Sequence, residues 1–265
     1  MKPNRTILLT FDIEEFDLPL EYNKPIAFDE QMMVGKRGLD NVMQIIANQQ
    51  VVTTMFVTGR FALQFSDTIK QLSRVHEIAS HSFSHTSFEK GDLLKSRLAL
   101  EQITGKPVIG LRMPRMQKVS MEWVKEAGYS YDSSINPTYI PGRYNNCRLP
   151  RTWYREEGML RLPTSVSPNL RIPLFWLAFK NFPYSLYKIL ALQTLKKDGY
   201  LSLYFHGWEF TDVSRHDLPF YTKKHSGNIL IIRLNKLITD LKNEADFSSV
   251  QSYIEANSLI NCKAL

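Results

Sequence analysis

Residues 6–12 have the sequence TILLTFD, and this stretch decides the fold class of the chain. It is a short run of apolar and β-branched residues that ends in an acid, which predicts a buried strand. Apolar residues at the spacing of one helix face follow at residues 36–49, and a second β-branched run follows at residues 51–57. Strand, helix and strand in this order predict a parallel βαβ unit.

The same alternation continues along the rest of the chain. The later strands are predicted at residues 77–80, 108–112, 131–133 and 199–206, and the later helices at residues 60–72, 92–104, 120–128 and 230–241. Repeated units of this kind predict an α/β protein, either a barrel of the TIM type or a doubly wound sheet. Because no linker or internal repeat is present, we predict one domain over residues 1–265. Residues 136–183 are loop-rich and aromatic, and we expect them to wrap around the barrel.

The composition is that of an ordinary globular protein. Of the 265 residues, 43% are hydrophobic and 22% are charged, and a chain this long can bury a core without disulfide or metal support. The two cysteines, Cys147 and Cys262, form no CxxC pattern, which fits a reducing compartment. The apolar stretch after residues 1–5 is too short for a signal-peptide core, and prolines and lysines interrupt the apolar residues 172–192. We therefore expect a cytoplasmic protein without a membrane span, with association at the inner face of the membrane as an alternative.

The net charge is +7, because 33 lysines and arginines face 26 acids. This excess favours anionic neighbours, but the charges form no basic stripe, so no nucleic-acid partner is predicted. Phe175, Trp176 and Phe179 could form a lipid-facing patch, yet we interpret them as core or groove lining because aromatic residues are mostly buried. Peripheral contact with a membrane or a lipid-linked glycan stays an alternative.

Ionisable residues follow the predicted strands, at the point where each strand ends. These residues are Asp12 and Glu14 after the first strand, His81 and His85 after residues 77–80, and Arg112, Asp132 and His206 at the ends of three later strands. In α/β barrels the carboxyl ends of the strands form the rim where active sites lie. We therefore expect these side chains to converge on one site.

The segment HSFSH at residues 81–85 indicates a metal site. Two histidines four residues apart lie on one face of a helical turn and can bind one ion, for which zinc, cobalt, nickel or iron are suitable. The segment lacks the glutamate of an HExxH helix, so a metalloprotease is not favoured. The alternative is a pair of surface or capping histidines.

Two acids after the first strand can complete such a site. Asp12 and Glu14 project to the same side of a strand, so one can be a metal ligand and the other a base. For Glu15 and Asp17 we favour a solvated acidic loop. At the far end of the chain, a glycine and Trp208 follow His206, which suits a rim position beside a ring that stacks on a sugar.

Five motifs occur in an order that resembles the polysaccharide deacetylases of the NodB-homology type, carbohydrate esterase family 4. The motifs are TFD at residues 10–12, HSFSH at 81–85, LRMP at 111–114, YDSS at 131–134 and LYFH at 203–206. The resemblance implies a distorted, TIM-like (β/α)7 barrel that hydrolyses the acetamide of N-acetylated sugars. It also implies a divalent metal ion, with zinc as the first choice, bound by His81, His85 and an acidic ligand.

The resemblance also implies a role for each motif residue. Asp12 would be the general base, and His206 the general acid that protonates the departing amine. Arg112 would keep the base ionised by ion pairing, and Asp132 would orient and charge His206. A backbone N–H near Arg115 would face the oxyanion.

The sequence departs from the family pattern at two places. Ile13 stands where the family has a metal-binding aspartate, and Glu14 is the natural substitute because it shares a strand face with Asp12. Arg115 replaces the family's aromatic residue after Pro114. Arg115 would either meet a phosphate or carboxylate of the substrate or be a solvated arginine. The predicted substrate-binding side chains are Pro114, Arg115 and Trp208.

We therefore predict a metal-dependent hydrolase that removes N-acetyl groups from an amino sugar. The substrate would be a cell-surface polysaccharide or its lipid- or nucleotide-linked precursor. One alternative is a hydrolase of the same fold that acts on a non-sugar C–N bond, although relatives of that kind often lose the metal histidines. Two others are a catalytically silent glycan-binding relative and a peripheral membrane-binding protein.

Overall fold

A nine-stranded sheet forms the centre of the protein, which is described here by a computed structural model over residues 5–259. Its strands are β1 (Thr6–Ile13), β2 (Thr54–Val57), β3 (Glu77–Ser80), β4 (Gly110–Leu111), β5 (Tyr131–Asp132), β8 (Tyr154–Glu156), β9 (Met159–Arg161), β10 (Tyr200–His206) and β11 (Asp246–Phe247). The order is β10-β1-β2-β3-β4-β5-β9-β8, and β11 also pairs with β1. All pairings are parallel except that of β8 with β9. The sheet curls into a distorted, open barrel, which confirms the predicted fold class.

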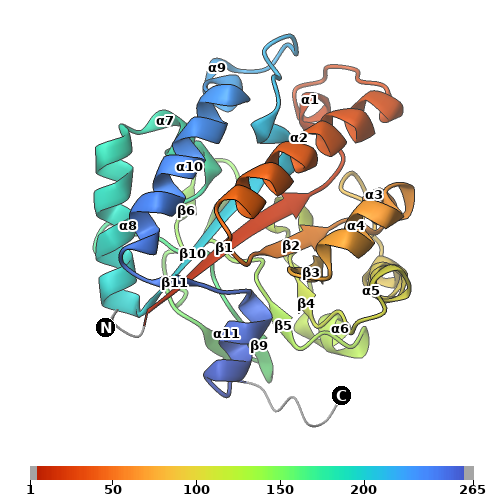
Figure 1. Ribbon diagram of the computed structural model, residues 1–265. Coiled ribbons are helices and arrows are strands. Elements are labelled where there is room, and N and C mark those ends of the chain that lie inside the picture. The colour runs from red at the N-terminus through yellow and green to blue at the C-terminus, as the bar shows by residue number, and fades with distance from the viewer. Residues whose placement is uncertain (1–4, 260–265) are drawn as a thin grey trace.

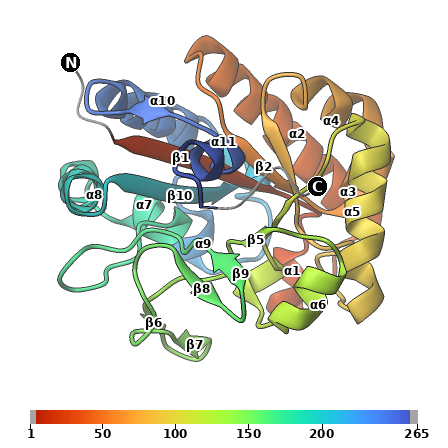
Figure 2. The ribbon, with the colours of Figure 1, turned by 90° about the horizontal axis from the view of Figure 1, so that it is seen from below.

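Helices cover the outside of this sheet (Figure 1). They are α1 (Leu18–Glu21), α2 (Phe28–Asn48), α3 (Gly59–Gln64), α4 (Ser66–Leu72), α5 (Lys90–Thr104), α6 (Met121–Glu126), α7 (Trp176–Asn181), α8 (Tyr184–Asp198), α9 (Phe220–Lys223), α10 (Asn228–Lys242) and α11 (Val250–Ala256), with the 3₁₀ turns η1 (Pro114–Met116) and η2 (Gly207–Phe210). Helices α8 and α10 lie on one flank and α3 to α6 on the other. Figure 2 shows the short hairpin of β6 (Tyr139–Ile140) and β7 (Tyr144–Asn145) outside the main sheet.

The predicted elements differ from the observed ones mainly at their ends. The helix predicted at residues 36–49 is α2, which begins at Phe28, eight residues before the predicted start, and the helix predicted at residues 60–72 is two helices that meet at Phe65. Residues 136–183 do more than wrap around the barrel, because they supply β9, which pairs with β5, and its antiparallel neighbour β8. Strands of three residues carry no periodic signal, so the sequence pattern did not indicate them.

The central strand β1 brings the first and last motifs together. Residues Ile7 to Ile13 of β1 are all buried, as expected for a parallel strand covered on both faces. In the pairing of β1 with β10, Asp12 lies directly opposite His206. Two residues that are 194 positions apart in sequence (206 minus 12) therefore lie side by side at the carboxyl edge of the sheet.

Helix α2 packs directly against the backbone that carries the site. A methyl group added at Gly35 would lie 2.4 Å from the carbonyl oxygen of Glu14, and one added at Gly38 would lie 2.2 Å from that of Gly207. Neither distance leaves room for a side chain. The two glycines therefore allow α2 to support the segment after β1 and the segment after β10 at close range.

We predict that Gly38→Ala lowers the free energy of unfolding by about 1–3 kcal/mol, the usual cost of overpacking a core. The control is Gly91→Ala in α5, where an added methyl group meets nothing within 4 Å. This control should leave stability unchanged or raise it by up to about 1 kcal/mol. Urea denaturation followed by circular dichroism measures both variants, and equal stability of the two would contradict the prediction.

Candidate metal centre and active site

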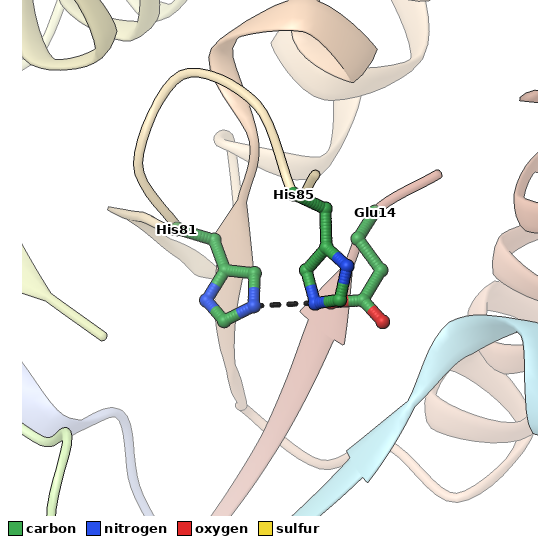
Figure 3. Close-up of side chains that lie close together, drawn as sticks. All are labelled: Glu14, His81 and His85. Atoms are coloured by element: carbon green, nitrogen blue, oxygen red, sulfur yellow. Dashed lines mark ion pairs between the residues drawn. The ribbon is translucent and has the colours of Figure 1, made fainter. Parts of the chain in front are cut away.

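Three donor side chains converge at the carboxyl edge of the sheet. Glu14 follows β1, and His81 and His85 follow β3 (Figure 3). The Glu14 Oε2 atom lies 3.0 Å from the Nε2 atoms of both His81 and His85, and all three residues are buried. One ligand atom from each side chain lies within 4.8 Å of the others, so the group can hold a metal ion.

The two histidines reach this point from a loop and not from the predicted helical turn. Ser82, between them, has a φ angle of 61°, which is incompatible with a right-handed helix. Its carbonyl oxygen accepts hydrogen bonds from the Gly59 amide and the Ser96 hydroxyl. These bonds fix the loop so that the two imidazole rings stack with centroids 5.6 Å apart.

In each donor side chain, the second polar atom has a hydrogen-bond partner that fixes the orientation of the side chain. His81 Nδ1 lies 2.8 Å from the Arg112 carbonyl oxygen, and His85 Nδ1 lies 2.7 Å from Asp17 Oδ1. The indole N–H of Trp208 donates to Glu14 Oε1 at 3.0 Å. The facing atoms Glu14 Oε2 and His81 Nε2 are buried and have no well-aligned hydrogen bond among the described residues. Two imidazole nitrogens and a carboxylate oxygen, oriented in this way, fit a divalent ion such as zinc.

The electrostatics of this centre favour a charged carboxylate. Burial raises the pKa of Glu14, but His85, His206 and His81 outweigh it and hold the pKa well below its ordinary value. Burial lowers the pKa of His85, but Glu14 and Asp17 outweigh it and raise the pKa to about 10. Without an ion, the centre therefore carries a negative carboxylate that pairs with the histidines.

Asp12 is fixed by a buried arginine beside this centre. Arg112 is fully buried and donates to Asp12 Oδ1 at 2.7 Å and to Thr10 Oγ1 at 2.8 Å. Its guanidinium carbon lies 4.0 Å from the centre of the Phe56 ring. The ion pair is the one that the sequence resemblance implied, whereas the role of Asp12 as a base stays a prediction.

His206 is oriented by Glu209 and not by Asp132. Glu209 Oε1 lies 3.1 Å from His206 Nδ1 and accepts from the His206 amide at 2.7 Å. Asp132 is instead occupied by Ser134 and by Arg161, whose Nε donates to it at 2.9 Å. The predicted pairing of Asp132 with His206 is therefore wrong. The spacing HGWE, with an acid three residues after the histidine, was the signal that would have indicated Glu209.

Glu209 is itself held by a second buried charge. Lys180 Nζ lies 3.2 Å from Glu209 Oε2, and both side chains are fully buried. The same ammonium group donates to the Thr222 carbonyl and the Ser226 hydroxyl at about 3 Å. Burial lowers the pKa of His206, but Glu14 and Glu209 outweigh it and raise the pKa above its ordinary value. His206 therefore stays protonated to a higher pH than a free imidazole.

The acids after Glu14 lie inside the protein, contrary to the predicted solvated loop. Glu15 accepts a hydrogen bond from Thr58 at 2.6 Å, and Asp17 lies between His85 and Arg115. The guanidinium of Arg115 donates to Asp17 and to Glu21 at 2.7 and 2.6 Å. Arg115 is partly exposed and lines the cavity, and its guanidinium pairs with these two carboxylates; its contact with an anion of the substrate stays a prediction.

A cavity of about 260 Å³ opens in front of the centre. Its walls include Asp12, Glu14, His85, Arg115, Tyr144, Phe175, Trp176, Tyr204, His206 and Trp208. Phe175 and Trp176 line this cavity and Phe179 lies in the core, as predicted. Trp208 is 3% exposed and its ring stacks on His206, so it supports the site as well as lining it. Pro114, a predicted substrate-binding residue, is buried and is not part of the wall.

The structure is thus an open α/β barrel with two histidines and a carboxylate at its carboxyl edge that can hold a metal ion. Residues 1–131 match the sequence profile of the family described as polysaccharide deacetylase. No curated protein gives a significant match. No helix within residues 5–259 combines the length and the apolar character that are needed to cross a membrane.

Solved structures share the fold over almost the whole chain. A protein from Mycobacterium smegmatis assigned to the polysaccharide deacetylases has a TM-score of 0.66 at 17% identity and covers 99% of this chain and 94% of its own. The Bc1960 peptidoglycan N-acetylglucosamine deacetylase gives 0.53 at 16%, covering 95% and 89%. A pseudoenzyme of carbohydrate esterase family 4 from Bacillus anthracis gives 0.52 at 13%, covering 95% and 66%. The profile match covers the first half of the sequence up to Tyr131, and the solved structures show that the fold is shared.

We predict that the purified protein binds about one zinc ion per chain and that His81→Ala abolishes this binding. The matched control is His76→Ala, because His76 bonds to Thr53 and lies outside the centre. Elemental analysis after dialysis measures the bound metal. Zinc retained in His81→Ala, or lost equally in both variants, would contradict the assignment.

We also predict that Asp17→Asn lowers the zinc affinity by about 10- to 100-fold, the usual effect of removing the partner of a ligating histidine. The substitution keeps the size of the side chain but removes the carboxylate that holds His85 Nδ1. A competition titration with a chromogenic chelator measures the affinity. Asp67→Asn, on the surface of α4, is the control and should bind zinc as the wild type does.

Proposed function

We propose that the protein is a metal-dependent hydrolase that removes the N-acetyl group from an amino sugar. The observation that carries this proposal is that Asp12, His206 and the two ligands Glu14 and His85 all line one cavity. The profile match over residues 1–131 supports the reaction class, and one structural relative is named as an N-acetylglucosamine deacetylase. The N-acetylated unit would belong to a cell-surface polysaccharide or to its lipid- or nucleotide-linked precursor.

Amide hydrolysis needs a base, a polarised carbonyl and an acid. A divalent ion held by Glu14, His81 and His85 would polarise the acyl carbonyl and make a nearby water more acidic. Asp12 would accept the proton of the attacking water. The ion pair with Arg112 stabilises the carboxylate form that this role requires.

In this proposal His206 would act as the acid. It faces the same cavity as Asp12, and the sheet register sets the two residues opposite each other. Glu209 holds the proton on Nδ1, so Nε2 of a protonated His206 is free to donate to the departing amine nitrogen. The orientation of the acid would therefore depend on the Glu209–Lys180 pair.

A catalytically silent relative is the alternative that the departure at Ile13 raises, because pseudoenzymes of this fold exist. Against it stands the complete donor set, in which Glu14 provides the carboxylate. The non-sugar hydrolase is also disfavoured, since both metal histidines are present.

Acetate release from N-acetylglucosamine and its oligomers by the zinc-loaded protein tests the proposal. Release should fall by about 100- to 10,000-fold in Asp12→Asn, the usual contribution of a general base. Equal release by Asp12→Asn would overturn the assignment of the base.

We predict that Glu209→Gln lowers kcat by about 10- to 1,000-fold, because a mispositioned imidazole is a poor proton donor. The zinc content and KM should change little. The acid must be protonated, so activity falls as the pH rises through the pKa of His206. Since Glu209 raises that pKa, its removal should move the alkaline limb of the pH–rate profile to lower pH.

Asp132→Asn is the matched comparison for this experiment. In the structure Asp132 pairs with Arg161, so its substitution should leave the alkaline limb in place even if it lowers stability. A shift of that limb in Asp132→Asn, with none in Glu209→Gln, would restore the partner that the sequence resemblance implied.

A further inference from the structure

The positive charge of the protein comes from one stretch of its chain. Residues 158–242 contain twelve lysines and arginines and five acids, a difference of +7, whereas the rest of the sequence contains 21 of each. Most of this stretch builds α7, α8, β10, α9 and α10. Helices α8 and α10 lie on the flank away from α3 to α6, so much of the basic excess belongs to one side of the molecule (Figure 1).

Large apolar side chains are exposed in the same part of the structure. Phe220 in α9 is 71% exposed, and Ile229 and Ile232 at the start of α10 are 56% and 70% exposed. Within residues 5–259, Leu170 is the only large apolar residue that is more exposed than Phe220. Single exposed apolar residues are normal, but a group of them marks an interaction surface.

Lysines without an acidic partner accompany these apolar residues. Lys224 Nζ lies 5.8 Å from the centre of the Phe220 ring. Lys236 is exposed and follows Ile232 by four residues, so the two side chains lie on one face of α10. Neither lysine forms an ion pair within the described part of the chain. Their charges are therefore available to an anionic partner.

Acids do not cancel this charge. Residues 218–239 contain no acid and four basic residues. Asp217 and Asp240, which bracket this segment, pair with lysines outside it. Asp212 is exposed and lies near Ile229, but the four basic residues outnumber it. The surface of α9 and α10 is therefore both apolar and positive.

Helix α9 also forms part of the wall of the cavity beside the metal centre. Tyr221 and Thr222 line that cavity, and Phe220 directly precedes them. The side chain of Asn181, at the end of α7, donates to the Tyr221 carbonyl at 2.9 Å and fixes α9 in place. The exposed apolar residues of α9 and α10 therefore begin next to the cavity wall.

We infer that the face formed by Phe220, Ile229, Ile232, Lys224 and Lys236 binds the surface of an anionic bilayer. The apolar side chains would enter the headgroup region, and the lysines would attract the anionic lipids. A second copy of the chain is a poorer occupant, because a symmetric contact sets the same lysines against each other. Binding through this face brings the cavity wall at α9 to the lipid surface.

Co-sedimentation with lipid vesicles tests this inference, and it needs neither substrate nor turnover. The protein should bind mixed vesicles of phosphatidylcholine and phosphatidylglycerol about tenfold or more tightly than vesicles of phosphatidylcholine alone. This preference should disappear when the salt rises from about 0.01 M to about 1 M, because the Debye length falls from about 30 Å to about 3 Å. No binding to the mixed vesicles, or equal binding to both kinds, would overturn the inference and leave the proposed reaction untouched.

The apolar contribution is tested with Phe220→Ser combined with Ile232→Ser. This variant should bind the mixed vesicles about 10- to 100-fold more weakly, because two apolar side chains no longer leave water. The matched control is Leu63→Ser with Leu98→Ser, which removes side chains that are 53% and 50% exposed on α3 and α5. The control should bind as the wild type does. Equal weakening of both variants would show that the face has no special role.

The charge contribution is tested with Lys224→Gln combined with Lys236→Gln. This variant should bind the mixed vesicles about 25-fold more weakly, since each lysine near an anionic surface contributes about fivefold. Lys70→Gln with Lys95→Gln, at exposed positions of α4 and α5, is the control with the same change of charge. Both variants should bind phosphatidylcholine vesicles as the wild type does. A similar loss in the two variants would mean that only the total charge matters, and the inference would be wrong.

Analytical ultracentrifugation without lipid tests the other occupant of this face. The inference expects the same sedimentation for the wild type and for Phe220→Ser with Ile232→Ser. A dimer of the wild type that this variant dissociates would show that a second copy covers the face, and the membrane assignment would fall. Circular dichroism and zinc content confirm that each variant is folded.

Discussion

The Glu14 carboxylate, buried between His81 and His85, is the interaction on which the rest of the site depends. Removing a charge from water costs several kcal/mol unless charges and hydrogen bonds compensate it. Here one oxygen faces both imidazoles and the other accepts from Trp208. Trp208 also stacks on His206, so one side chain supports both Glu14 and His206. A divalent ion would satisfy the facing donor atoms that now have only each other.

Two series of ion pairs and hydrogen bonds extend outward from this centre. One series runs from His85 to Asp17 and on to Arg115, which pairs with Glu21 in the cavity wall. The other series runs from His206 through Glu209 to Lys180, which also donates to the carbonyl of Thr222 beside the cavity. Each acid satisfies a histidine on one side and a basic group on the other. The orientation of the centre and the wall of the cavity therefore depend on one network of charges.

Much of the fold and the core of the site follow from local patterns. The apolar run of β1, and histidines and acids that follow predicted strands, are enough to predict an α/β barrel with Glu14, His81 and His85 at its rim. The burial of Asp17 was not predictable in this way, because it depends on contacts with His85 and Arg115 from distant segments, and a polar loop has the same composition whether it is solvated or buried. Glu209 did leave a local signal, the acid three residues after His206, whereas the pairing of Asp132 with Arg161 depends on a distant segment. Strand β9 was missed for a related reason, since long-range pairing and not its own sequence makes it a strand.

The departure at Ile13 is explained by the same central strand. Side chains alternate along β1, so residue 13 points away from the side on which Asp12 and Glu14 lie. Ile13 is 1% exposed, and its Cδ1 atom packs against Gly207, where a methyl group would come within 3.1 Å of it. A carboxylate at this position would be buried against apolar neighbours and the close approach of α2 and η2, without a partner for its charge. A carboxylate at Glu14 avoids that cost, because the indole of Trp208 holds one of its oxygens and the other faces His81 and His85.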